Sequence, residues 1–279
     1  MKRLGFAFNP TMDAAMVLRE RALAWCSARG IDAWAAAASE YDTLVEELGT
    51  TEALIVLGGD GTFLRAARAV AVADIPILGI NAGKVGFLSK AESDALESVL
   101  DQLLRKEYTL EPRMVLEARL LPLGREHGGA VHVALNEAAI VRGSQARVVR
   151  LELQVDGSHV ATYIADGLVV ASPTGSTGYS FSAGGPILDP TARNLVVTPI
   201  AAYLSAIRSI VVGARHTVTV RVVDAVDCQV SIDGREDVPL AIGDVVRVRA
   251  RERPIHFIEP HGSMPFWELL RHKAELLPS

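Results

Sequence analysis

A short glycine-rich segment holds the residues with the clearest chemical character. It reads Gly58-Gly59-Asp60-Gly61-Thr62, follows an apolar run at 54–57 and precedes a stretch with helical character. Glycines at a strand-to-helix turn let the backbone approach a ligand closely, and the free N–H groups at the helix start favour phosphate. The spacing matches neither of the two familiar phosphate-binding loops. The residues expected to hold a phosphoryl donor are Gly58, Gly59, Gly61, Thr62 and Arg65.

Asp60 is unexpected in this loop because a carboxylate repels phosphate. Two functions would explain a carboxylate at this position: it could hold a Mg²⁺ ion that bridges phosphates, or it could accept a proton from an attacking hydroxyl group. The alternative is that Asp60 only caps the helix and the glycines form a tight turn. Because three glycines and a leading strand surround it, the functional interpretation is favoured. Asp60 is the candidate catalytic residue.

A second segment, residues 165–186, joins an apolar strand to a dense run of hydroxyl side chains and glycines. Many small hydrogen-bonding groups beside exposed backbone suit a polyhydroxylated, planar ligand such as a nucleoside, and Tyr179 offers a ring face and an O–H group. The segment lacks the Gly-x-Ser-x-Gly spacing of serine hydrolases. A long surface loop is the alternative, but the apolar entry favours a ligand site.

Two shorter segments complete the candidate site. Asn136 and Glu137 directly follow an apolar strand, and the carboxylate can accept both hydroxyls of a ribose while the amide holds another part of the ligand. Residues 81–88 follow a different apolar strand, so their loop is expected to face the same crevice as Asp60. Phe87 in that loop either borders a planar ring or belongs to the core.

The elements that would position these residues fall into two groups. In residues 1–107, short apolar runs alternate with helical stretches, which is typical of βαβ units and a parallel sheet covered on both faces. Residues 108–260 contain short β-branched segments with close turns, which predict an all-β sandwich. In residues 261–279, Phe266 and Leu277 belong to an apolar series at helical spacing. The predicted fold is an open, Rossmann-like α/β domain and a C-terminal β-sandwich domain, with a terminal helix packing back on the first domain.

Composition excludes several classes of protein. The 279 residues are 49% hydrophobic and 22% charged, which excludes disorder. The net charge of −5, without a cluster of basic residues, argues against nucleic acid or a membrane surface as partner. No apolar run reaches the roughly 18 residues of a membrane span. Cys26 and Cys228 are expected as free thiols in a reducing compartment, so a cytoplasmic location is predicted, and the His and Cys spacing predicts no dedicated metal cage.

Taken together, these segments resemble the NAD kinase family, the enzymes that use ATP or polyphosphate to phosphorylate the adenosine ribose of NAD. The resemblance covers nearly the whole chain, and its most specific part is the segment from Asp166 to Pro186. The other matching segments, in family order, are 58–62, 81–88, Asn136-Glu137, 198–200, 232–234 and 266–273.

The resemblance assigns roles to individual residues. It implies that Asp60 acts as a base or metal-linked carboxylate at the 2′-hydroxyl group, in a reaction that needs Mg²⁺ with the donor. It also implies that Asp166 contributes to a site completed by a neighbouring subunit, so that the protein is a homo-oligomer, either a dimer or a tetramer. The residues implied to bind NAD are Asp60, Gly61, Phe87, Asn136, Glu137, Asp166, Thr174, Thr177, Gly178, Tyr179 and Ser182.

Two positions depart from the family pattern. Tyr203 stands where most members have histidine, and Gly178 replaces the more usual alanine. Two other functions remain open from the residues. A lipid kinase of the diacylglycerol or sphingosine type shares the Gly-Gly-Asp-Gly-Thr loop, and a non-catalytic NAD-binding protein could use the same fold.

Overall fold

The structure of the chain, a computed structural model, describes residues 1–83, 86–125, 127–143, 147–203 and 207–276. The chain divides into two units, the first made of Met1–Arg113 and Ile255–Ser279 and the second of Met114–Pro254. Of the segments singled out in the sequence, Lys84, Val85 and Leu277 lie outside the described residues.

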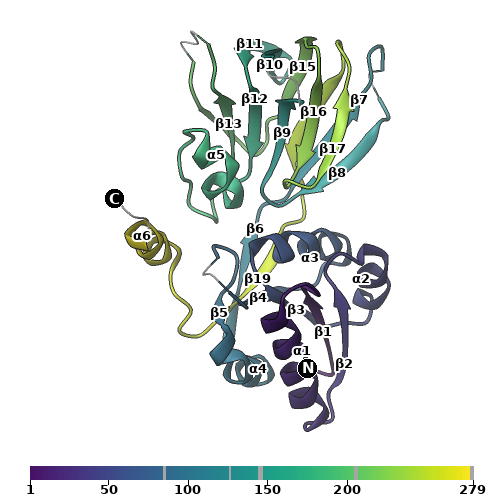
Figure 1. Cartoon of the computed structure of the whole chain (residues 1–279), viewed down its shortest axis with the longest axis vertical. Coiled ribbons are helices and arrows are strands. Elements are labelled where there is room, and N and C mark those ends of the chain that lie inside the picture. Colours follow the sequence, from purple (N-terminus) through teal and green to yellow (C-terminus); the bar gives the residue numbers. More distant parts are fainter. Residues whose placement is uncertain (84–85, 126, 144–146, 204–206, 277–279) are drawn as a thin grey trace. The chain divides into compact units, whose positions relative to one another are not determined.

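The first unit is built on one mainly parallel sheet with the strand order β2-β1-β3-β4-β19-β6, and the short β5 pairs with β4 (Figure 1). β1 to β4 pair in parallel, as does β19 with β4, while β6 runs antiparallel to β19. The strands are β1 (Arg3–Phe8), β2 (Asp32–Ala37), β3 (Ala53–Gly58), β4 (Ile77–Asn81), β5 (Ala91–Glu92), β6 (Tyr108–Arg113) and β19 (Ile255–Pro260).

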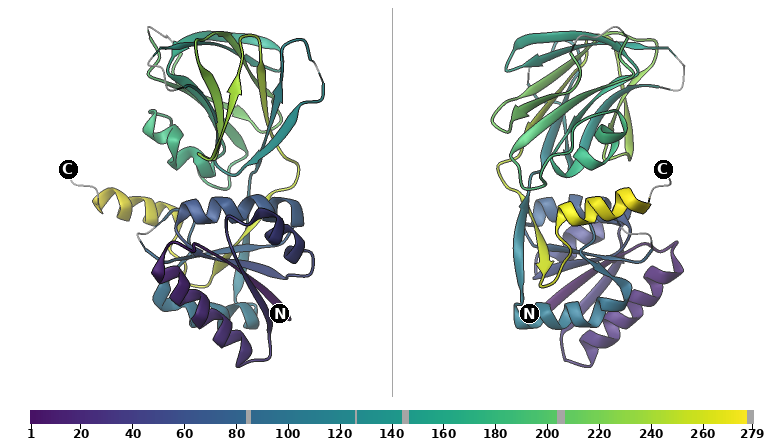
Figure 2. Two further views of the ribbon diagram at one scale, coloured as in Figure 1. Left: turned by 45° about the vertical axis from the view of Figure 1, so that its right-hand side comes forward. Right: turned by 90° about the vertical axis from the view of Figure 1, so that its left-hand side faces the viewer.

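Helices cover both faces of this sheet. In the two views of Figure 2, α1 and α4 lie on one face and α3 on the other, where α2 packs beside it. Apolar side chains on these helices and on the fully buried strands, such as Leu18, Ile55 and Leu100, fill the core. The helices are α1 (Asp13–Ser27), α2 (Tyr41–Leu48), α3 (Asp60–Ala73), the 3₁₀ turn η1 (Ser93–Ala95), α4 (Leu96–Arg105) and α6 (Phe266–Leu276). The predicted Rossmann-like architecture is confirmed.

The terminal helix α6 packs on the first unit, as predicted. The ring centroids of Phe266 and Phe87 are 6.3 Å apart, and the Nζ atom of Lys273 lies 4.2 Å from the centroid of the Phe87 ring. Leu269 is buried. None of the helices in the described ranges is both long and apolar enough to cross a membrane.

The second unit is the predicted sandwich. One antiparallel sheet has the order β11-β10-β15-β18-β7-β8 and the other β14-β13-β12-β9-β16-β17. Alternate residues of both sheets, such as Leu151, Tyr163 and Val220 from one and Ile140 and Val230 from the other, share one buried core. The strands are β7 (Leu116–Leu121), β8 (Ala130–Ala134), β9 (Glu137–Arg142), β10 (Val149–Val155), β11 (Ser158–Ala165), β12 (Gly167–Ala171), β13 (Asn194–Ile200), β14 (Ile210–Gly213), β15 (Val218–Asp224), β16 (Cys228–Ile232), β17 (Glu236–Leu240) and β18 (Val245–Ala250). The 3₁₀ turn η2 (Thr174–Thr177) and the short helix α5 (Tyr179–Ser182) follow β12.

The boundaries between the units differ from those expected at 107/108 and 260/261. β6 and β19 pair with each other from Tyr108 to Arg113, and β19 also reaches β4. Residues 108–113 and 255–260 therefore belong to the sheet of the first unit. Their short β-strand pattern resembles that of the sandwich strands, so the pattern alone assigns them to the wrong sheet.

Candidate functional site

The carboxylate of Asp60 anchors the loop that follows β4. Asp60 is the first residue of α3, directly after β3, and is partly buried. Its Oδ2 atom accepts a hydrogen bond from the backbone N–H of Phe87 at 2.9 Å, and its Oδ1 atom accepts one from the N–H of Leu88 at 3.1 Å. The loops after two adjacent parallel strands thus meet at Asp60, as the sequence predicted. These two contacts fix the direction of the carboxylate.

Gly86 makes room for that carboxylate. A Cβ atom at Gly86 would lie 2.0 Å from Oδ1 of Asp60, so a side chain there would displace the acid. The sequence analysis placed Gly86 in a matching segment without giving it a role. Only the contact between the two loops reveals that it sets the position of Asp60.

The expected donor loop divides into packing residues and accessible ones. A Cβ at Gly58 would lie 2.7 Å from the hydroxyl oxygen of Thr62, which is itself buried, so these two residues pack against each other. A Cβ at Gly59 or Gly61 would have no neighbouring atom within 4 Å, so open space adjoins the backbone there. Arg65 is exposed on α3.

Asn81 fixes the start of the neighbouring loop. It is 1% exposed, and its side-chain amide donates to Oε2 of Glu92 and to the carbonyl oxygen of Gly83, both at 2.9 Å. The N–H of Gly83 donates back to Oδ1 of Asn81 at 3.1 Å. Phe87, further along this loop, is half-buried against α6. Its contact with Phe266 means that part of the ring serves packing.

In the second unit, Asp233 holds the backbone around Asn136 and Glu137. Its carboxylate accepts three backbone hydrogen bonds, from the N–H groups of Leu135 at 2.9 Å, Asn136 at 2.8 Å and Glu137 at 3.1 Å. Asp233 is buried and follows β16, which pairs with β9. Its φ of 49° is in the left-handed region, where Asp is better tolerated than most residues. The sequence contains Asp233 within a matching segment, but nothing in the sequence indicates this contact.

The side chains that Asp233 positions have polar atoms without partners. Oδ1 of Asn136 and Oε2 of Glu137 are buried and make no hydrogen bond within the described part of the chain. Burial raises the pKa of Glu137 to about 8, and the negative charge of Asp233 adds to the effect. Burial also raises the pKa of Asp233, but its three N–H contacts favour the charged form. Glu137 is therefore largely protonated near neutral pH.

The hydroxyl-rich segment packs directly on these two residues. A Cβ at Gly178 would lie 3.3 Å from Oε2 of Glu137 and 3.7 Å from the amide nitrogen of Asn136. A Cβ at Gly175 would lie 2.3 Å from the backbone oxygen of Asn136. The backbone N–H of Ser172 donates to that same oxygen at 2.8 Å. The structure thus brings the two segments together, and the glycines allow their close approach.

The hydroxyl groups of this segment have different environments. Three of them bond to the segment or to its neighbours: Ser172 donates to the backbone oxygen of Leu135 at 2.5 Å, Ser176 to that of Pro173 at 2.7 Å, and the Ser180 hydroxyl lies 2.9 Å from that of Thr198. The residues that the family resemblance assigns to an adenosine pocket differ in exposure. Thr174 is buried, Thr177 is partly buried, and Tyr179 and Ser182 are exposed.

Asp166 and Tyr203 lie at the other end of β12. Asp166 is partly exposed, and its Oδ1 accepts a hydrogen bond from Nε of Arg142 at 2.9 Å. Tyr203 is 68% exposed, and its N–H donates to the backbone oxygen of Ile164 at 2.8 Å. The Tyr203 ring therefore faces solvent within the described part of the second unit.

No group of three or more His, Cys, Asp or Glu side chains in the described ranges is arranged to hold a metal ion. Cys26 and Cys228 are free and buried, and burial raises the pKa of each thiol to about 11. These thiols are therefore neutral and unreactive at neutral pH.

Comparison with known proteins relates the chain to one family. The family model described as the ATP-NAD kinase N-terminal domain matches residues 11–108, and the ATP-NAD kinase C-terminal domain matches residues 135–260. The NAD kinase of Symbiobacterium thermophilum is 45% identical over 226 residues, 81% of this chain and 79% of that protein. The NAD kinase of Gemmatimonas aurantiaca is 42% identical over 80% of this chain and 76% of its own, and that of Dehalococcoides mccartyi 33% over 98% and 96%.

Solved structures share the fold. Yeast NADH kinase complexed with NADH superimposes with a TM-score of 0.84 at 21% identity, covering 99% of this chain and 87% of that one. An NAD kinase from Archaeoglobus fulgidus in complex with ATP gives a TM-score of 0.76 at 25% identity, covering 99% and 100%. With both family models matched and relatives 33–45% identical over four fifths or more of its length, the chain belongs to the NAD kinase family.

Proposed function

We propose that the protein transfers the γ-phosphoryl group of ATP to the 2′-hydroxyl group of the adenosine ribose of NAD, forming NADP. The observation that carries this proposal is the pair of buried, unpartnered oxygens on Asn136 and Glu137, beside the glycine Gly178. Leaving buried polar atoms unpaired costs free energy, so such atoms are typical of a site whose partner is a ligand. A ribose diol offers the hydroxyl groups that these oxygens lack.

Glu137 and Asn136 would bind that ribose. Glu137, protonated near neutral pH, can donate one hydrogen bond and accept another, and Oδ1 of Asn136 accepts one. Asp233 keeps both backbones in place before the ligand arrives. This preorganisation lowers the entropy that binding must overcome.

We assign the contacts to the adenosine base, and the remaining contacts to NAD, from the family pattern. We assign the adenosine pocket to Thr174, Thr177, Gly178, Tyr179 and Ser182, and a bordering role to Phe87. The exposed ring of Tyr179 is available for stacking on a purine.

Asp60 would act on the hydroxyl group that receives phosphate. The ribose 2′-oxygen attacks the γ-phosphorus of ATP, the bond from that phosphorus to the β,γ-bridging oxygen breaks, and ADP leaves. The proton of the hydroxyl group passes to an Asp60 carboxylate oxygen. Because the N–H groups of Phe87 and Leu88 hold the carboxylate, it enters the reaction already oriented.

The donor would contact the loop at Gly59 and Gly61, where open space adjoins the backbone, while Gly58 packs against Thr62 and shapes the turn. A Mg²⁺ ion fits this site as a companion of the donor, since magnesium is commonly held by substrate phosphates with one or two carboxylates. Asp60 is the carboxylate of the loop, and the ion would neutralise charge on the transferring phosphoryl group. ATP is proposed as donor because of the family description, and polyphosphate is the alternative.

We further propose a cytoplasmic homo-oligomer, either a dimer or a tetramer. Free buried cysteines fit a reducing compartment. The partly exposed Asp166, held by Arg142, is the residue that would reach a neighbouring subunit's site. Light scattering coupled to gel filtration of the unchanged protein and of Asp166→Ala tests the assembly, and steady-state kinetics of the two proteins tests the contribution of Asp166 to the KM for NAD.

The reaction itself is tested by incubating the protein with Mg²⁺, NAD and either ATP or polyphosphate and measuring NADP. Diacylglycerol replaces NAD in a parallel reaction. We expect NADP with ATP and no phosphorylated lipid. NAD binding by calorimetry without any NADP from either donor would show a non-catalytic binding protein.

A further inference from the structure

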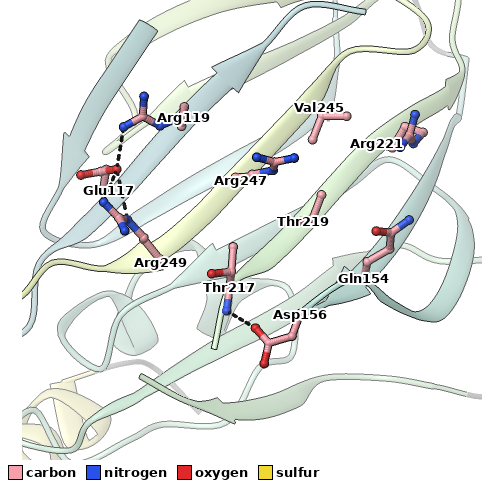
Figure 3. A pocket seen from close by; sticks show the side chains of 11 residues that line it. Glu117, Arg119, Gln154, Asp156, Thr217, Thr219, Arg221, Val245, Arg247 and Arg249 are labelled. Carbon is pink, nitrogen blue, oxygen red and sulfur yellow. Dashed lines mark hydrogen bonds and ion pairs between the residues drawn. The ribbon is translucent and has the colours of Figure 1, made fainter. Parts of the chain in front are cut away.

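A hollow lies on the outer face of one sheet of the sandwich, apart from the residues discussed above. Its volume is about 480 Å³, and it spans β10, β15, β18 and β7 (Figure 3). All of its lining residues belong to the second unit. They are Glu117, Arg119, Gln154, Asp156, Gly157, Thr217, Thr219, Arg221, Val245, Arg247 and Arg249.

The lining of the hollow has the opposite charge to the chain as a whole. Four arginines and two carboxylates give it an excess of two positive charges, in a protein whose net charge is −5. The positive side chains are Arg119, Arg221, Arg247 and Arg249. A concave surface lined by one sign of charge concentrates ligands of the other sign.

Two of these arginines stand directly opposite each other on neighbouring strands. In the register of β18 and β7, Arg247 pairs with Arg119, and on its other side Arg247 pairs with Thr219 of β15. Like charges at directly opposite positions of an antiparallel pair destabilise the sheet. An anion bound over this pair would remove the repulsion.

The nearest carboxylate is shared between two arginines. Oε1 of Glu117 lies 3.3 Å from a terminal nitrogen of Arg119 and 3.0 Å from one of Arg249, as the dashed lines in Figure 3 show. The side chain of Glu117 is largely covered by these contacts. Among the lining residues, the single negative charge of Glu117 thus serves two guanidinium groups, those of Arg119 and Arg249.

Two other acidic groups of the described residues, Asp156 and Glu152, lie toward the opposite edge of the hollow. The Asp156 carboxylate accepts the N–H of Thr217 at 2.8 Å and is 2.6 Å from Nδ1 of His216. Glu152 lies 3.7 Å from Nε of Arg221. Among the lining residues, the β18 and β7 side of the hollow is therefore the positive part, and the Thr219 side chain borders it.

We propose that this hollow binds a small anion with two or more phosphate groups, held by Arg119 and Arg247. Planar guanidinium groups bind phosphate oxygens in pairs, and neighbouring arginines on adjacent strands can bind successive phosphates of one chain. A single phosphate group would contact only some of these arginines. The proposal does not depend on the proposed kinase reaction, since it concerns other residues.

Titration calorimetry with inorganic tripolyphosphate tests this, with orthophosphate as the second probe. The variants are Arg247→Glu, the double variant Arg119→Gln with Arg247→Gln, and Arg150→Gln as a matched control. Arg150 is an exposed arginine of the same sheet that does not line the hollow. Binding at the glycine loop contributes equally to all four proteins, so the differences between them report on the hollow.

We expect tripolyphosphate affinity to fall at least about tenfold in both hollow variants, because charged hydrogen bonds are lost, and to change less than twofold in Arg150→Gln. Tripolyphosphate should bind at least about tenfold more tightly than orthophosphate, and the difference should shrink in 0.5 M salt. Urea unfolding and the circular dichroism spectrum check that each variant keeps its fold.

Three results would overturn the proposal. One is unchanged tripolyphosphate binding in the hollow variants, and another is an equal loss in Arg150→Gln. The third is a change of oligomeric state in the hollow variants without any tripolyphosphate site in the unchanged protein, which would show that this face joins two copies of the chain. The kcat and the KM for NAD should stay within twofold in every variant.

Discussion

Oδ1 of Asp60 occupies the space that a Cβ atom of Gly86 would fill, with only 2.0 Å between the two positions. The acid and the glycine are far apart in the chain, yet neither position can change without affecting the other. Together with the N–H groups of Phe87 and Leu88, this contact fixes the carboxylate before any substrate binds.

Asp60→Asn should lower kcat by about 10² to 10⁴-fold, the usual contribution of a general base. The amide keeps the shape of the side chain but cannot take the proton. The measurement is NADP formation under saturating ATP and NAD, with the circular dichroism spectrum and NAD affinity checked for a preserved fold and site. An NADP rate equal to that of the unchanged enzyme would contradict the assigned role.

Gly86→Ala should reduce kcat by about 10²-fold, because a misplacement of about 1 Å at a reacting group has an effect of this size. The new methyl group meets the end of the Asp60 side chain, which can swing away, so the effect should fall on catalysis more than on folding. Gly83→Ala is the control in the same loop, since its nearest neighbour is the Met12 methyl carbon at 3.7 Å. Equal activities of the two variants would refute the coupling of Gly86 to Asp60.

Asp233→Asn should raise the KM for NAD by about tenfold and destabilise the protein by about 1–3 kcal/mol, because an amide cannot accept all three backbone hydrogen bonds. Asp244→Asn is the control. Asp244 accepts the N–H groups of Leu123 at 2.9 Å and Ala241 at 2.8 Å in a turn of the same unit. The control should lose stability without a change in KM. If both variants raise the KM alike, Asp233 acts through stability only.

The free energy of unfolding should fall as the pH rises from about 4.5 to about 8. The ordinary pKa of Glu137 is 4.5, and burial raises it to about 8, so across this window the folded chain holds a proton that the unfolded chain has released. The proton-bound folded state is therefore favoured at the acid end, and this advantage is lost toward pH 8. Asp233, whose pKa burial also raises, acts in the same direction.

Glu137→Gln removes most of that dependence. Urea unfolding at pH 6 and pH 8 should show a smaller difference in this variant, and the variant should be the more stable protein at pH 8, by something on the order of a few kcal/mol. Its KM for NAD should increase. A pH dependence as steep as that of the unchanged protein would mean that a different group titrates.

The local patterns of the chain were sufficient to predict the folds of both units and the approach of the loop after β4 to Asp60. Alternation of apolar runs with helical stretches, as at Ile55 and Leu78, predicts the parallel sheet because strands covered on both faces need no polar residues. The rule that loops after adjacent parallel strands meet at one edge placed residues 86–88 near Asp60, and the structure confirms it.

What the sequence could not predict depends on contacts between distant residues. Asp233 looks like an ordinary turn residue, and its three bonds arise only because β16 lies beside β9. Ser172, Ser176 and Ser180 resemble ligand-binding hydroxyls in the sequence, yet they hold the backbone of the segment and its neighbours. The like-charged pair of Arg119 and Arg247 becomes visible only in the strand register.

The position of β19 bears on how the chain folds as it leaves the ribosome. β6 is joined to the first sheet through β19 alone in the strand order, and β19 begins at Ile255, after the whole sandwich has been synthesised. The sandwich is a continuous insertion, Met114–Pro254, in the sequence of the first unit. It can therefore reach its native form before β19 has been synthesised and has paired with β6. The N-terminal unit, although its synthesis begins first, cannot be completed before the whole sandwich has been synthesised.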